Sequence, residues 1–83
     1  MNYKKIKHLA EAVLKNKTAE EMVNFLKGIL TSKEIMEMST RLEIVKMLKK
    51  GIPQRVIAEK IGVGVATITR GSKELQMGRF RNV

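Results

Sequence analysis

The 83-residue sequence contains no cysteine and only one histidine, one proline and three aromatic side chains. Without cysteine the chain can form neither a disulfide nor a thiolate metal site, and His8 has no second histidine with which to hold zinc. RNA-binding proteins stack bases on aromatic rings, and only Tyr3, Phe25 and Phe80 are present. These absences exclude a disulfide-stapled or zinc-dependent protein and argue against RNA recognition.

Long apolar runs and catalytic patterns are also missing. No run approaches the roughly 20 residues of a membrane-spanning helix, and residues 1–10 are too charged for a signal peptide. The sequence has no nucleophile beside a base, no metal cluster and no phosphate-binding loop of Walker spacing. We therefore expect a non-catalytic cytoplasmic protein of bacterial type, associated with the nucleoid.

Basic residues are abundant and unevenly placed. Seventeen Lys and Arg against eight Asp and Glu give a net charge of +9 and a pI near 10.2. Residues 49–83 hold eight basic and two acidic side chains, whereas residues 1–48 hold nine and six. A positive field concentrated in the second half attracts phosphates and makes nucleic-acid binding salt-dependent. The total charge alone would suit a ribosomal or membrane-surface protein equally well.

Helical periodicity runs through nearly the whole sequence, and no segment alternates like a strand. Residues 2–16 form one amphipathic pattern. Thr18 with Glu21, and later Thr31 with Glu34, have the spacing of capping boxes, which predict a second helix and a longer third one that ends near Gly51. The apolar stripes of the first two helices are wider than so small a domain can cover, so we expect them to pack between subunits. The alternative is that they fill an intramolecular core.

The most informative stretch is residues 54–76, QRVIAEKIGVGVATITRGSKELQ, which has the pattern of two short helices joined by a turn. Ala58 is small where the helices would cross, and Gly62 can adopt the positive φ that ends the first helix. Ile57 and Ile68 fill the wedge between the helices. This pattern predicts a helix-turn-helix, although a plain packing hairpin is the competing interpretation. The predicted DNA contacts are small, hydroxylated, polar or basic residues that face outward: Gln54, Arg55, Val65, Ala66, Thr67, Thr69 and Lys73.

The segment GVGVATITRGSKEL closely resembles the reading helix of the tryptophan repressor family, and the similarity extends upstream through LTSKEIMEMSTRLEIVKMLKKG. It covers roughly residues 30–75, while residues 1–29 agree only in helical character. Helical periodicity predicts five helices, and the resemblance implies that they form an all-α fold with a helix-turn-helix, assembled as an interlocked homodimer. It also implies a small corepressor held between the reading helix and the dimer core.

The resemblance assigns ligand-binding roles to several residues. Arg41 and Arg70 match the two arginines that flank the indole ring of tryptophan, and a planar guanidinium can both stack on a ring and bind a carboxylate. Thr31 matches a hydroxyl that helps to bind the ligand carboxylate, and the carbonyl of Leu30 matches an acceptor for its ammonium. Gly71 matches a position that lets the ring approach the backbone.

Each of these residues also has a structural interpretation. Thr31 is explained by helix capping and Gly71 by close packing, and the arginines could be solvated or bind phosphates. Glu74 stands where tryptophan-binding members carry a small hydroxyl residue. Its carboxylate could accept hydrogen bonds from the ligand ammonium, or pair with Lys73 or Lys60.

Together these features predict one helical DNA-binding domain, made of a dimerisation core (1–50), a helix-turn-helix (53–76) and a basic tail (77–83). We expect a repressor that binds a double-stranded operator and is gated by a small aromatic amino acid such as L-tryptophan, with no other cofactor. One alternative is constitutive DNA binding without a corepressor. Another is a non-catalytic adaptor that binds protein or RNA through its helical stripes.

Overall fold

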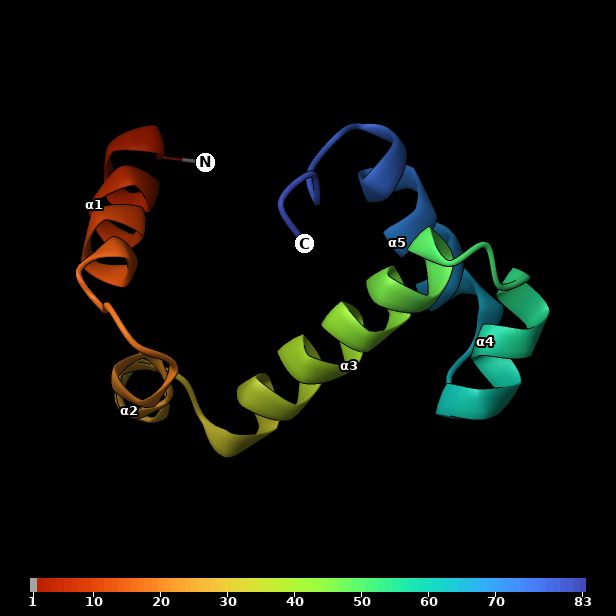
Figure 1. The fold of residues 1–83 in the computed structure, drawn as a ribbon, viewed down its shortest axis with the longest axis horizontal. Coiled ribbons are helices and arrows are strands. Elements are labelled where there is room, and N and C mark those ends of the chain that lie inside the picture. Colours follow the sequence, from red (N-terminus) through yellow and green to blue (C-terminus); the bar gives the residue numbers. More distant parts are fainter. Residues whose placement is uncertain (1) are drawn as a thin grey trace. The chain divides into compact units, whose positions relative to one another are not determined.

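The computed structural model describes residues 2–83, which form five helices and no strand, and this confirms the all-α fold (Figure 1). The helices are α1 (Tyr3–Leu14), α2 (Ala19–Ile29), α3 (Ser32–Lys49), α4 (Gln54–Ile61) and α5 (Val65–Gln76). The chain forms two compact units that divide between Ile35 and Met36, inside α3. Within the described residues, no helix is long and apolar enough to cross a membrane.

Threonine side chains fix where α2 and α3 begin. At α3, the Glu34 N–H donates to Thr31 Oγ1 (3.1 Å) and the Thr31 N–H donates to Glu34 Oε1 (2.9 Å), which completes the predicted capping box. The hydrogen bond with the Thr31 backbone is the main cause that lowers the pKa of the Glu34 carboxyl, and the hydrogen bond with the Thr31 side chain lowers it further. At α2, Thr18 Oγ1 accepts from the Glu21 N–H, as the Thr18–Glu21 capping box predicts. The Glu21 carboxylate accepts from the Lys17 N–H rather than from the Thr18 N–H, so only half of this box forms.

The N-terminal unit exposes the apolar faces of its helices. Neither α1 nor α2 contains a buried residue. Ile6, Leu9, Val23 and Ile29 each keep between 44% and 50% of their surface exposed. Ile6 and Leu9 lie one turn apart on α1, so the predicted apolar face of this helix is accessible in the described residues.

The core of the C-terminal unit lies where α3, α4 and α5 meet (Figure 1). Ile44 of α3 packs against Ile57 and Ala58 of α4 and Ile68 of α5, and all four are buried. Half-buried apolar residues surround this cluster: Met47, Leu48, Ile52, Ile61 and Val63. The predicted wedge of the helix-turn-helix is therefore confirmed, and it is anchored on the C-terminal half of α3.

The turn between α4 and α5 depends on Gly62. Its φ of +81° lies in the left-handed region, where a residue with a Cβ is strained. The N–H groups of Gly62 and Val63 both donate to the carbonyl oxygen of Ala58, at 2.9 and 3.2 Å, and so satisfy the end of α4. Because α5 starts only three residues later, this turn sets the angle at which α5 crosses α4, as the sequence predicts.

Candidate functional site

Helix α5, the predicted reading helix, presents small and basic side chains to solvent. Val65, Ala66 and Thr67 form its first turn and are exposed, and Lys73 is exposed in its last turn. Small side chains at the start of a helix let the backbone approach base edges, while a lysine further along can reach a phosphate. The structure thus leaves this part of the predicted DNA contact accessible, and the contact itself remains a prediction.

Two further residues of the predicted DNA contact bind each other. The Thr69 hydroxyl lies 2.9 Å from Gln54 Oε1 and 3.1 Å from the carbonyl oxygen of Val65. Since a hydroxyl has one proton, it donates to one of these acceptors at a time. The bond to Gln54 links the first residue of α4 to the middle of α5 and orients the Gln54 amide, whose NH₂ group can donate to a phosphate or a base. Arg55, the next residue of α4, is exposed.

A pocket of about 120 Å³ lies between α3 and α5. Four of the six predicted ligand residues line it, namely Arg41 from α3 and Arg70, Gly71 and Glu74 from α5. The other lining residues are Ile44, Val45, Thr67 and Phe80. An apolar floor edged by charged groups suits a small amphipathic ligand that carries both a ring and polar substituents.

The two arginines come to the pocket from different helices. Arg41 and Arg70 are both exposed, and neither takes part in an ion pair within residues 2–83. A guanidinium in this situation can stack on an aromatic ring or bind a carboxylate in a bidentate manner. The geometry is therefore compatible with a flat, anionic group between α3 and α5, and equally with binding of a phosphate.

Gly71 faces α3, but packing against α3 does not require a glycine at this position. A Cβ at this position would lie 3.6 Å from Cγ2 of Ile44 and 3.7 Å from Cδ1 of Leu48, which are ordinary van der Waals distances. Close packing of α5 on α3 thus tolerates alanine. The space that the missing side chain leaves adjoins the pocket, which Gly71 lines together with Ile44.

Glu74 pairs with a residue that the sequence did not suggest. Its Oε2 lies 3.3 Å from Nε of Arg79, so neither Lys73 nor Lys60 is its partner. Phe80 lines the pocket and was also missed, because residues 77–83 were interpreted as a basic tail. The available signal was Gly78, a turn-forming residue directly after a helix and two positions before an aromatic ring.

The remaining two predicted ligand residues belong to the N-terminal unit. Leu30 is the C-cap of α2, where its N–H donates to the carbonyl oxygen of Leu26 at 2.9 Å. The Thr31 hydroxyl caps α3 as described above. Both residues therefore have structural roles, and their parts in ligand binding stay predictions.

The sequence is similar to proteins of one known family. The sequence matches the family described as Trp repressor protein over residues 4–81. It is 35% identical over 75 residues to a Trp operon repressor homolog of Vibrio campbellii, which covers 89% of this chain and 75% of that protein. It is 32% identical over 75 residues to the uncharacterized protein YerC of Bacillus subtilis, which covers 90% of this chain and 72% of that protein. No solved structure matches the chain with significance. Because the family match spans nearly the whole sequence, the chain belongs to the Trp repressor family.

Proposed function

We propose that the protein is a homodimeric, sequence-specific DNA-binding repressor whose operator affinity is raised by a small aromatic amino acid, with L-tryptophan as the first candidate. The observation that supports this most is the place of the pocket. Arg70 and Gly71 line it from the same helix that exposes Val65 and Ala66 to solvent. A ligand and an operator would thus act on one short rigid element.

The coupling between ligand and operator follows from the spacing of two reading helices. In dimeric helix-turn-helix proteins, a group for which this family is a type example, the two readers enter successive major grooves about 34 Å apart. A ligand between α3 and α5 holds α5 away from α3 and so sets that spacing. A coupling free energy in the usual range of about 1–3 kcal/mol corresponds to an affinity change of about 5- to 150-fold. Titration of operator DNA with and without L-tryptophan tests the proposal.

Constitutive operator binding is the second candidate. The exposure of Arg41 and Arg70 favours it, because exposed guanidinium groups beside a reading helix can bind DNA phosphates. In that case the protein would need no ligand, and L-tryptophan would leave the operator affinity unchanged.

The exposed stripes of α1 and α2 lead to a prediction about assembly. We expect the protein to sediment at micromolar concentration with about twice the 9.4 kDa mass of one chain, because a second copy would bury the apolar faces. Leu9→Glu should shift the protein toward monomer, since it places a charge within the buried interface. Lys5→Glu changes charge on the same helix without removing an apolar side chain and should remain dimeric. A folded wild-type monomer would contradict the interlocked arrangement.

A second prediction separates the packing role of Gly71 from its role in the pocket. Gly71→Ala should raise the free energy of unfolding by about 0.5–1 kcal/mol, because alanine is favoured over glycine inside a helix and its Cβ meets α3 at ordinary distances. The same substitution should weaken L-tryptophan binding on the order of tenfold, because overpacking a close-fitting site costs about 1–3 kcal/mol. Thermal unfolding and calorimetry measure the two effects.

Gly28 provides a matched control for this substitution. It lies in α2, and a Cβ there would meet nothing within 4 Å. Gly28→Ala should therefore raise stability without changing L-tryptophan affinity. If Gly71→Ala is more stable and binds L-tryptophan as well as wild type does, no ring lies against the backbone at this position.

A further inference from the structure

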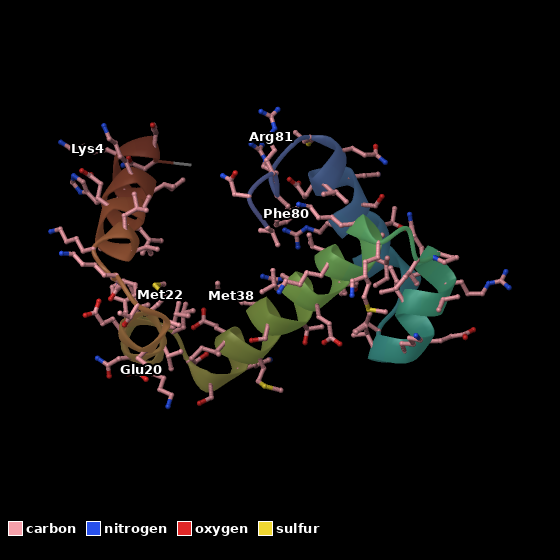
Figure 2. The ribbon with its side chains drawn as sticks, viewed as in Figure 1. Lys4, Glu20, Met22, Met38, Phe80 and Arg81 are labelled. Atoms are coloured by element: carbon pink, nitrogen blue, oxygen red, sulfur yellow. The ribbon has the colours of Figure 1, made fainter. Side chains whose placement is uncertain are left out.

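The segment after α5, residues 77–83, turns back toward the pocket. The Gly78 N–H donates to the Leu75 carbonyl oxygen (3.0 Å), and the Arg79 N–H donates to the Glu74 carbonyl oxygen (3.2 Å). Gly78 has a φ of +83°, which glycine adopts without steric cost and which reverses the chain direction at the helix end. Phe80 follows this turn, in the segment after α5 where Figure 2 labels it. It is one of the residues that line the pocket.

Two adjacent side chains of this segment resemble the groups of an aromatic amino acid. The Arg79 guanidinium lies 3.3 Å from the Glu74 carboxylate, which is the group available to an incoming ammonium. The Phe80 ring lines the pocket beside Ile44 and Val45, which form the apolar floor available to an incoming ring. The tail therefore adds a flat ring to the lining of the pocket and pairs a cation with Glu74, the one carboxylate that lines it, although Arg79 itself does not line the pocket.

The space that remains is small. With Phe80 in place, the pocket measures about 120 Å³, whereas a protein cavity that accepts benzene measures roughly 150 Å³. An indole is larger than benzene by a fused five-membered ring. In this partly open pocket, an indole would therefore compete with the Phe80 ring for space along the lining.

The attachments of the tail are weak enough to break. The Glu74–Arg79 pair is largely solvated, with 40% and 63% of the two side chains exposed, and exposed pairs contribute little to stability. A further contact is a hydrogen bond from Lys49 Nζ to the Val83 carbonyl oxygen, 2.7 Å long and also exposed. Release of the tail would break these two exposed contacts and uncover the half-buried Phe80, none of which belongs to the buried core of α3, α4 and α5.

We propose that residues 77–83 are an internal competitor for the ligand pocket, and that an aromatic amino acid binds by displacing Arg79 and Phe80. This inference rests on the proposed function, because it takes an aromatic amino acid as the ligand. Only molecules whose tail is released have room for the ligand ring. The apparent affinity for the ligand is therefore reduced in proportion to the fraction of such molecules. The tail thereby sets the ligand concentration at which the repressor responds.

Docking of the tail can be measured without a ligand. The chain contains no tryptophan, so a single introduced indole reports only on its own position. Phe80→Trp should emit at the short wavelength of a ring in apolar surroundings. Met77→Trp, at a tail position that is 63% exposed, should emit like an indole in water. Identical water-like emission from both variants would overturn the proposal.

Competition is tested by titrating L-tryptophan, whose fluorescence is also free of background from the chain. We expect the double variant Arg79→Gln/Phe80→Ala to bind L-tryptophan at least about fivefold more tightly than wild type, because the pocket is then always open. The matched control, Met77→Ala/Asn82→Ala, removes an apolar and a polar side chain of the same segment that are exposed and do not line the pocket. It should bind like wild type.

The outcomes separate the two proposals. If wild type binds L-tryptophan and the Arg79→Gln/Phe80→Ala variant binds no more tightly, the competition is refuted and Phe80 is simply a wall of the site. If neither protein binds L-tryptophan, gating by tryptophan and the competition both fall. Tighter binding by this variant, including binding that wild type lacks, supports the internal competitor.

Discussion

Replacing Ala66 by glutamate is expected to abolish retardation of operator DNA while leaving the helical circular dichroism unchanged. Ala66 is exposed in the first turn of α5 and does not line the pocket. A carboxylate there would face the phosphates and base edges of the groove, and like charges brought together at an interface cost several kcal/mol, so the affinity should fall at least about 100-fold. The helix itself should persist, because acidic side chains are favourable near a helix N-terminus.

Asn24→Glu is the matched control for this variant. Asn24 is exposed on α2, outside the helix-turn-helix, and the substitution changes the net charge by the same amount. It should retard the operator nearly as well as wild type at the same salt concentration. If Ala66→Glu also retards the operator normally, α5 is not the reading helix and another basic surface must bind the DNA.

The second large effect is expected at Arg70. If this arginine stacks on the ligand ring and donates a charge-assisted hydrogen bond, the two contacts together contribute about 2–3 kcal/mol. Arg70→Leu should then weaken L-tryptophan binding by roughly 30- to 150-fold, as measured by calorimetry. The fold should be unaffected, because Arg70 is exposed and lies outside the buried cluster.

Two further substitutions show whether the loss is specific. Arg55→Leu removes an exposed arginine of α4 that does not line the pocket and should leave L-tryptophan binding unchanged. Arg70→Lys keeps the charge but not the planar face, and should recover only part of the affinity. Normal L-tryptophan binding by Arg70→Leu would contradict a ligand site at Arg70 and favour a role in phosphate binding.

The helix-turn-helix could be predicted from the sequence because its requirements are local. Ala58, Gly62 and Ile68 are specified by the crossing, the turn and the wedge of two helices within residues 54–76. The structure buries Ala58 and Ile68 and gives Gly62 a positive φ, as expected. The prediction of a ligand pocket between Arg41 and Arg70 is based on resemblance to a family. Spacing could not have given it, because periodicity does not indicate which helices lie side by side.

The position of residues 77–83 could not be predicted from local sequence patterns. A glycine after a helix predicts a turn, but not that the turn returns Phe80 to a pocket built largely from residues 41–45 and 67–74. That result depends on the angle between α3 and α5, which long-range packing sets. The apolar stripes of α1 and α2 show a similar limit. Ile6 and Leu9 lie one turn apart on α1 and yet are 44% and 47% exposed, because the pattern specifies a face and not its partner.

The central claim, that an aromatic amino acid in the pocket controls DNA binding through α5, is tested most directly by titrating an operator with the wild-type protein in the absence and presence of saturating L-tryptophan. The operator can be a duplex selected by the protein from a random pool in the presence of L-tryptophan. The account predicts that L-tryptophan lowers the apparent Kd by about 5- to 150-fold. Equal operator affinity with and without L-tryptophan would contradict it.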